Sequence, residues 1–222
     1  MKSFLKKLSV VSVAAICVLA LLALGACEMG GGGKNKTSAK DEASEYANTY
    51  YFEAELTCAD EWVGGGWSGG QSGTGLIVPD SDNVGASNGY FLTYTWSEGL
   101  CVYFEITATE DTTAKLSLRL GNEIEAVEMN SAKFAVEVNE VDINYTPFTL
   151  KAGDAEHHKA TGFDNYAIGT INLKKGANTI ALYVGDWRFD DQHVFGPVID
   201  AIKLECNSTL SMMQYTENIA NL

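Results

Sequence analysis

The feature of this 222-residue chain that most limits its fold is a two-residue alternation of apolar side chains. Residues 100–107 alternate between apolar side chains at even positions and mixed side chains, among them Tyr103 and Glu105, at odd positions. Residues 113–120 and 180–184 repeat this pattern. Because successive side chains of a β-strand point to opposite faces, each segment predicts a strand with one buried face.

Several other short segments are rich in apolar, β-branched and aromatic residues and predict further strands. They are 50–57, 75–79, 90–96, 134–138, 141–149, 166–172 and 198–205. Turn-forming pairs such as Gly121-Asn122 and Lys175-Gly176 separate them, and no long helical period is present. Roughly ten short strands with one apolar face each must bury these faces against one another. The sequence therefore predicts an all-β protein, an antiparallel β-sandwich of the jelly-roll kind.

The N-terminus carries a targeting signal. Three lysines precede an apolar run over residues 8–24, which ends in Leu24-Gly25-Ala26-Cys27. This layout predicts a secretory signal peptide over residues 1–26 and lipid attachment to Cys27, with an uncleaved membrane anchor as the alternative. Either reading places the rest of the chain outside the cytoplasm. We therefore expect a membrane-anchored bacterial lipoprotein on the extracellular face of the cell.

Composition divides the remaining chain and limits its partners. Residues 27–45 are rich in Gly, Lys, Ser and acid and predict a flexible linker, followed by a domain over 46–206 and a tail over 207–222. The whole chain has a net charge of −14. Without residues 1–26 it keeps 12 basic residues against 29 acidic ones, a net charge of −17. Such a surface opposes nucleic-acid binding and suits neutral ligands or divalent cations.

Three acidic residues stand out within the predicted strands. In one extended strand, Glu53 and Glu55 would point to the same side, roughly 7 Å apart by strand rise. Asp200 would share a face of the last strand with Val198, Ile202 and Leu204, so that it interrupts an apolar row. A carboxylate on an inward face needs a partner or a metal. Several carboxylate oxygens together suit Ca²⁺, which takes 6–8 oxygen ligands.

These acids belong to a set of motifs in which the chain resembles the carbohydrate-binding modules of families 6 and 35. The set begins with Glu53-Ala54-Glu55 and continues with a Gly-aromatic strand, Ser87-Asn88-Gly89-Tyr90-Phe91-Leu92. It ends with Leu173–Ile180 and with Gly196-Pro197-Val198-Ile199-Asp200. The resemblance spans roughly residues 50–206 and implies a galactose-binding-like jelly roll that binds glycans.

The resemblance also implies a structural Ca²⁺ held by Glu53, Glu55 and Asp200. The alternative is a pair of solvated glutamates with one hydrogen-bonded aspartate. One position departs from the family pattern: Val198 stands where many members place a ligand-contacting Asn. This difference implies another ligand, another binding face or the loss of sugar binding.

In the family, aromatic side chains on loops at one end of the sandwich stack against the apolar faces of sugar rings. Gly162-Phe163 resembles the family's Gly-Trp loop, which makes Phe163 a candidate stacking residue. Other candidates lie on or beside the Gly-aromatic strand or in Gly- and Asp-rich loops. They are Tyr90, Trp96 and Trp187, with Trp62 and Trp67 as weaker candidates.

Nothing in the sequence singles out a catalytic constellation. His157, His158 and His193 lie in acidic, polar stretches without metal-ligand spacing, and there is no nucleophile elbow or phosphate-binding loop. We therefore expect a non-enzymatic, carbohydrate-binding lipoprotein. The alternative is a structural or protein-binding sandwich that takes part in adhesion or a complex. A glycan-cleaving enzyme is a more distant alternative, because it would need two carboxylates facing each other across a cleft.

Overall fold

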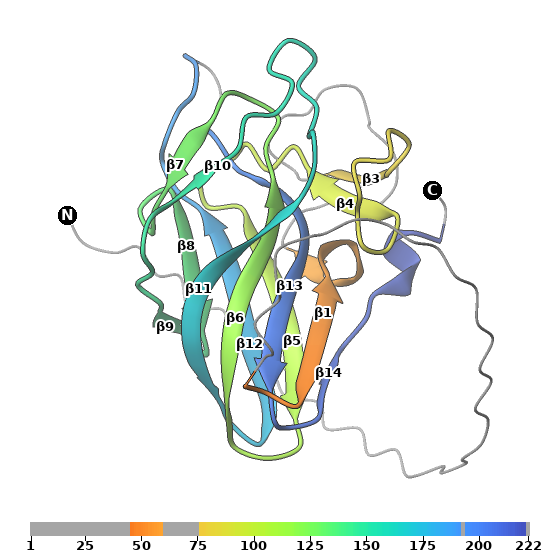
Figure 1. The fold of residues 1–222 in the computed structure, drawn as a ribbon, viewed down its shortest axis with the longest axis vertical. Helices are drawn as coiled ribbons and strands as arrows, with labels where there is room; N and C mark the ends of the chain where they lie inside the picture. Colours follow the sequence, from red (N-terminus) through yellow and green to blue (C-terminus); the bar gives the residue numbers. More distant parts are fainter. Residues whose placement is uncertain (1–44, 60–75, 192–193, 221–222) are drawn as a thin grey trace. The chain divides into compact units, whose positions relative to one another are not determined.

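The alternating segments pair into two antiparallel sheets that face each other, as Figure 1 shows for the computed structural model. The structure describes residues 45–59, 76–191 and 194–220. The predicted signal peptide, Cys27, Trp62, Trp67 and His193 lie outside the described residues. Within the described ranges, no helix combines the length and the hydropathy needed to cross a membrane.

Both sheets contain six strands. The first has the order β11-β6-β13-β4-β3, and β1 also pairs with β13. Its strands are β1 (Asn48–Glu53), β3 (Leu76–Pro79), β4 (Tyr90–Thr93), β6 (Thr112–Gly121), β11 (Asp164–Leu173) and β13 (Val198–Cys206). The second has the order β14-β5-β12-β8-β9, and β2 also pairs with β5. Its strands are β2 (Cys58–Ala59), β5 (Cys101–Ala108), β8 (Phe134–Val138), β9 (Val141–Asp142), β12 (Gly176–Val184) and β14 (Leu210–Met212).

A separate two-stranded ribbon pairs β7 (Val127–Met129) with β10 (Phe148–Leu150). Consecutive strands such as β5 and β6 lie in different sheets, so the chain crosses between the two layers. The predicted all-β, antiparallel β-sandwich is confirmed.

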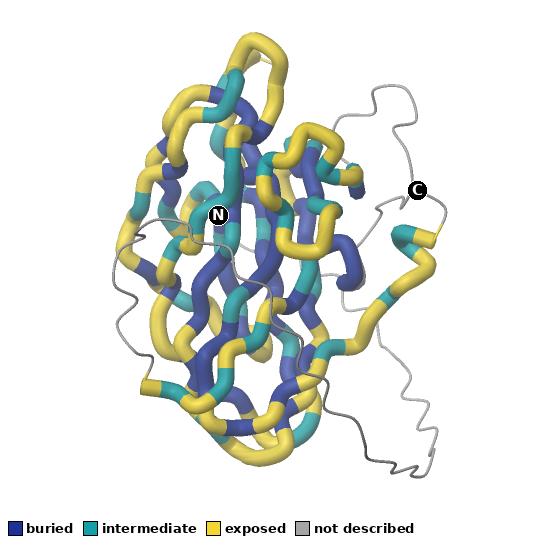
Figure 2. Tube along the Cα trace, turned by 45° about the vertical axis from the view of Figure 1, so that its right-hand side comes forward, coloured by how far each residue is buried: buried dark blue, intermediate teal, exposed yellow. Residues whose placement is uncertain are grey.

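The apolar rows of the two sheets meet in one core. Phe104 and Ile106 of β5 and Leu116 and Leu118 of β6 are fully buried in the same apolar cluster, although β5 and β6 belong to different sheets. Figure 2 shows the buried residues along the strands and the exposed ones mostly in the connecting loops. Burying one side chain of this size stabilises the fold by roughly 1.5–3 kcal/mol. Core packing therefore holds the strands on which the candidate sites are built.

A bulge in β13 places Asp200 differently from the prediction. The register with β6 shifts between Ile199 and Ala201, so Asp200 is the extra residue of the strand. The core cluster contains Ile199 before the shift and Ile202 and Leu204 after it, but not Val198. The prediction of one continuous row from Val198 to Leu204 is wrong, because a bulge changes the face that alternate residues occupy.

The first strand is also shorter than predicted. β1 ends at Glu53, and the 3₁₀ turn η1 (Ala54–Leu56) follows it, closed by a hydrogen bond from Thr57 N to Ala54 O. Glu55 is fully buried within this turn, whereas Glu53 is half-buried. The prediction that both glutamates project from one side of one strand is therefore wrong.

The segment after β13, expected only as a tail, adds to the sandwich. Its strand β14 pairs with β5, and the 3₁₀ turn η2 (Thr216–Asn218) follows. The Asn218 side chain donates hydrogen bonds to the carbonyl oxygens of Glu55 and Thr57, at 3.1 and 3.0 Å. The C-terminal segment thus lies against the turn that carries Glu55.

Candidate functional site

One candidate site is the acid cluster, which we define as Glu53, Glu55 and Asp200. The loop between β3 and β4 joins Glu53 to Asp200 through Ser87 and reaches Glu55 through Asn88. Ser87 Oγ lies 2.6 Å from Glu53 Oε2 and 3.0 Å from Asp200 Oδ2, and the Ser87 amide donates to Asp200 Oδ1 at 2.9 Å. A hydroxyl has a single proton to donate. One of the two carboxylate oxygens beside Ser87 therefore receives no proton from it.

Glu55 contributes a second unmet acceptor to the acid cluster. Its Oε1 accepts a hydrogen bond from Asn88 Nδ2 at 2.8 Å, while its buried Oε2 has no hydrogen-bond partner among the described residues. A buried carboxylate oxygen without a donor is costly. Burial raises the pKa of Glu55 to about 7 and also raises the pKa of Glu53 and of Asp200.

Arg119 of β6 is the cation beside the acid cluster, and the sequence reasoning missed it. Its Nε forms an ion pair with Asp200 Oδ2, and its terminal nitrogens donate to the carbonyl oxygens of Phe163 and Gly85. Arg119 is the outward-facing residue of an alternating strand, a position typical of solvated side chains. Only the pairing of β6 with the bulged β13 brings it to Asp200.

The donor chemistry of the acid cluster fits a calcium ion. Glu53, Glu55, Asp200, Ser87 and Asn88 all offer oxygens, the atoms that Ca²⁺ prefers. Glu55 Oε2 has no donor among the described residues, Glu53 and Asp200 share the single Ser87 proton, and Arg119 is one positive charge beside three acids. As these side chains stand, no three His, Cys, Asp or Glu groups within the described ranges converge on one point. Binding would require the carboxylates to turn from Asn88 and Ser87 toward the ion.

The four described aromatic candidates do not form one site. Phe163 packs edge-on against Phe91, with ring centroids 5.4 Å apart, and the Arg119 guanidinium lies over its ring. Tyr90 begins β4, opposite Pro79 of β3. Both therefore lie on the side of the molecule that carries the acid cluster.

The two tryptophans lie in a separate aromatic group. Trp96 packs against Tyr94 and Phe189, with centroids 4.8 and 5.6 Å away. Trp187 is half-buried, packs against Phe195, and has Lys133 Nζ 4.2 Å from its ring centroid. Their faces are thus already occupied in part by protein side chains.

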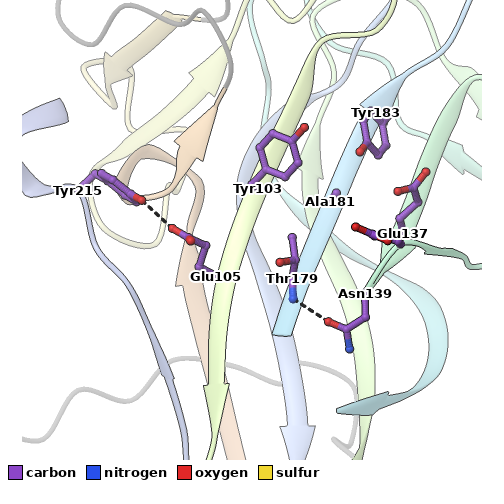
Figure 3. Close-up of a pocket in the computed structure, with 9 residues that line it drawn as sticks. Tyr103, Glu105, Glu137, Asn139, Thr179, Ala181, Tyr183 and Tyr215 are labelled. Carbon is purple, nitrogen blue, oxygen red and sulfur yellow. Dashed lines mark hydrogen bonds between the residues drawn. The ribbon is translucent and has the colours of Figure 1, made fainter. Parts of the chain in front are cut away.

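A second candidate site is a hollow on the outer face of the second sheet, which we call the tyrosine groove (Figure 3). Its volume is about 650 Å³. Its nine lining residues come from β5, β12, the β8–β9 hairpin and the C-terminal segment. They are Tyr103, Glu105, Glu137, Asn139, Glu140, Thr179, Ala181, Tyr183 and Tyr215.

The floor of the tyrosine groove follows from strand pairing. Ala181 of β12 lies opposite Tyr103 of β5 on one side and Glu137 of β8 on the other. Its methyl group leaves a depression between the larger side chains. The Tyr103 and Tyr183 rings meet edge to face, with centroids 6.4 Å apart, and form the aromatic wall.

The polar groups of the tyrosine groove are held in place. Tyr215 donates its hydroxyl to Glu105 Oε2 at 2.6 Å, and Asn139 Oδ1 accepts from the Thr179 amide at 2.9 Å (Figure 3). Burial raises the pKa of the Tyr103 and Tyr183 phenols, so both stay protonated at neutral pH. The lining includes three glutamates and no Lys, Arg or His. The groove therefore combines aromatic surface with hydroxyl and carboxylate groups.

The sequence analysis did not predict the tyrosine groove, because its candidate binding residues were mainly aromatic residues in loops. The sequence feature that could have indicated the groove is the set of outward-facing positions in the alternating strands, where Tyr103 and Glu105 stand two residues apart. Their convergence with Glu137 and Tyr215 depends on strand order. No local sequence pattern predicts the order of strands in a sheet.

No protein-family model and no curated protein sequence matches the chain. Among solved structures, a family 35 carbohydrate-binding module from Clostridium thermocellum superposes with a TM-score of 0.48 at 16% identity, over 71% of this chain and 98% of the module. A family 35 module from an environmental isolate gives 0.49 at 19% identity, over 73% and 96%.

The GH26-CBM35 β-(1,4)-mannanase of Podospora anserina gives 0.48 at 19% identity, over 72% of this chain and 28% of the enzyme. The chain thus spans little more than a quarter of that protein. These neighbours are of the family that the sequence motifs resemble. At TM-scores below 0.5 and identities under 20%, their function does not carry over by similarity alone.

Proposed function

We propose that the protein binds glycans without cleaving them and that the tyrosine groove is the binding surface. The observation that carries the proposal is the placing of two tyrosine rings beside hydrogen-bonding groups over an alanine floor. Aromatic faces bury the apolar C–H faces of a sugar ring. Carboxylates accept hydrogen bonds from its hydroxyl groups, and protein hydroxyls donate to them or accept from them. A protein-binding surface would instead present a contiguous apolar patch.

The charge of the tyrosine groove selects among glycans. Glu105, Glu137 and Glu140 disfavour uronic acids and sulfated sugars, because like charges repel. Neutral sugars suit this lining. The volume of about 650 Å³ lies well inside the range of roughly 300–1,000 Å³ typical of small-molecule sites, which favours an oligosaccharide segment over a single ring.

Affinity electrophoresis against a panel of neutral and acidic polysaccharides tests the glycan proposal. At least one neutral polysaccharide should retard the protein, and Tyr103→Ala and Tyr183→Ala should each weaken that binding by about tenfold, as expected for a lost stacking ring. Tyr51→Ala is the matched control, because Tyr51 is an exposed tyrosine of β1 in the other sheet. Binding unchanged by both groove variants would refute the assignment. Release of reducing sugar from the bound polysaccharide would refute the non-catalytic role.

We further infer that the acid cluster binds a structural calcium ion through Glu53, Glu55 and Asp200. The unmet Glu55 Oε2 and the single positive charge of Arg119 among three acids support this inference. When bound, the ion would supply the positive charge that these carboxylates lack. Its expected effect is on stability, and it would tie the end of β1 to the bulge of β13.

The membrane anchor is proposed from the sequence alone. The Leu24-Gly25-Ala26-Cys27 ending predicts a lipid on Cys27, which would display the sandwich on the outer face of a bacterial cell. Metabolic labelling with a fatty acid tests this. Wild-type protein should incorporate the label, and Cys27→Ser should not. Equal labelling of both would refute lipid attachment at Cys27.

A further inference from the structure

A second hollow, separate from the tyrosine groove, lies beside β3 and β4. We call it the Glu123 pocket. It measures about 320 Å³, at the small end of ligand sites, and so has room for one ring rather than a chain. Phe91, Thr93 and Tyr94 line it from β4 and the residue that follows, and Glu123 lines it from the loop after β6. The segment 158–160 completes its lining.

Glu123 is the unusual group in this pocket. Its side chain is 5% exposed, and Thr93 Oγ1 donates to its Oε1 at 2.5 Å. Its other oxygen, Oε2, is buried and has no hydrogen-bond partner among the described residues. Burial raises the pKa of Glu123 to about 7. Thr93 therefore satisfies one oxygen of the carboxylate, while Oε2 has no donor and no described cation forms an ion pair with Glu123.

The other charged groups of the pocket already have partners. The Asp80 carboxylate accepts hydrogen bonds from the amides of Val84, Gly85 and Ala86. Asp82 forms an ion pair with Lys159 at 3.1 Å, where both side chains are exposed. His158 packs edge-on against Trp96, with ring centroids 5.7 Å apart. Among the lining carboxylates, Glu123 is thus the one with an oxygen that no described residue bonds to and a charge that no described cation pairs with.

We infer that the Glu123 pocket binds a small ligand with a protonated primary amine, of the size and polarity of one amino sugar. An ammonium group supplies the charge and the N–H donors that Glu123 lacks, and charge-assisted hydrogen bonds are the stronger kind. The Phe91 and Tyr94 rings offer aromatic surface to the rest of the ligand. The amine rests on Glu123 alone, whereas the choice of a sugar as its carrier rests on the proposed glycan function.

Titration of the protein with glucosamine, glucose, N-acetylglucosamine and 2-aminoethanol, followed by NMR, tests the inference. Glucosamine should bind about tenfold or more tightly than the two sugars without a free amine. It should also shift the amide signals of Thr93 and Tyr94. Equal binding of glucose and glucosamine would overturn the amine. Equal binding of 2-aminoethanol and glucosamine would overturn the sugar.

Variants locate the binding and separate it from the groove. Glu123→Gln keeps the shape and removes the charge, so it should weaken glucosamine binding about tenfold or more. Glu125→Gln, which changes an exposed neighbour, should leave binding unchanged. The Tyr103→Ala and Tyr183→Ala variants should keep glucosamine binding even if the groove proposal fails.

If Glu123→Gln does not fold, the carbon-13 signal of the wild-type Glu123 carboxyl provides the test. That signal should move on addition of glucosamine, and an unmoved signal would refute the pocket.

Discussion

At the scale of single residues, Arg119 supplies the positive charge beside the three carboxylates of the acid cluster. It pairs with Asp200, donates to two loop carbonyls and covers the Phe163 ring. Its side chain is 18% exposed, so these interactions are largely shielded from water. Breaking an ion pair in such a place leaves the partner charge without compensation. Arg119 therefore stabilises the folded protein by compensating negative charge in the acid cluster.

We expect Arg119→Gln to lower the free energy of unfolding by about 2–4 kcal/mol at pH 7 in the presence of a chelator. The loss should be smaller at pH 5, because Glu55, whose pKa burial raises to about 7, is then protonated and repels the other two acids less. Urea denaturation at the two pH values measures both. Arg188→Gln is the control, because Arg188 is exposed and lies 3.9 Å from Asp186, so its loss should stay within about 0.5 kcal/mol. Equal effects of the two variants would contradict the role of Arg119.

At the scale of elements, short irregular pieces position the functional groups. The bulge of β13 presents Asp200, the 3₁₀ turn η1 buries Glu55, and the C-terminal segment adds Tyr215 to the tyrosine groove. The same segment reaches η1 through Asn218, which bonds to the carbonyls of Glu55 and Thr57. The C-terminal segment thus contacts both the acid cluster's turn and the groove.

Asn218→Ala removes two hydrogen bonds between η2 and the residues of η1 and just after it. We expect the free energy of unfolding to fall by about 1–2 kcal/mol, because a net hydrogen bond contributes about 0.5–1.5 kcal/mol. Chemical denaturation measures this loss. Asn172→Ala changes an exposed asparagine of β11 and should cost no more than about 0.5 kcal/mol. If the two variants match, the C-terminal segment does not support η1.

At the scale of the whole molecule, stability should depend on pH through its buried carboxyls. Burial raises the pKa of Glu55 and of Glu123 to about 7 in the folded state, against about 4.5 for an ordinary glutamate. Between these values the folded state binds more protons than the unfolded state, so stability falls as pH rises. Each group can cost up to about 3 kcal/mol once the pH exceeds 7.

Calcium should change this pH dependence. Without calcium, the melting temperature should fall steadily from pH 5 to pH 7.5. With calcium in excess, the fall should be smaller, because an ion bound only to the folded state stabilises it and favours the ionised form of Glu55. Calorimetry with calcium and with chelator measures the difference. Glu123→Gln should reduce the pH dependence without changing the calcium effect. Identical melting curves with calcium and chelator at pH 7.5 would remove the calcium proposal.

The sequence by itself determined the long alternating strands and the fold class, because an apolar period of two allows only paired sheets that bury one face. It did not indicate the short strands β7 and β14. It also placed Glu53 and Asp200 in the first and last strands of the first sheet, which the structure brings together through Ser87. Glu55 and Asp200 departed from their expected geometry, since a 3₁₀ turn and a bulge leave no signature in the alternation. Only the tertiary structure joined Arg119 to Asp200 and assembled the tyrosine groove and the Glu123 pocket. Each of these sites depends on strand order and register, which arise from long-range pairing rather than from local sequence.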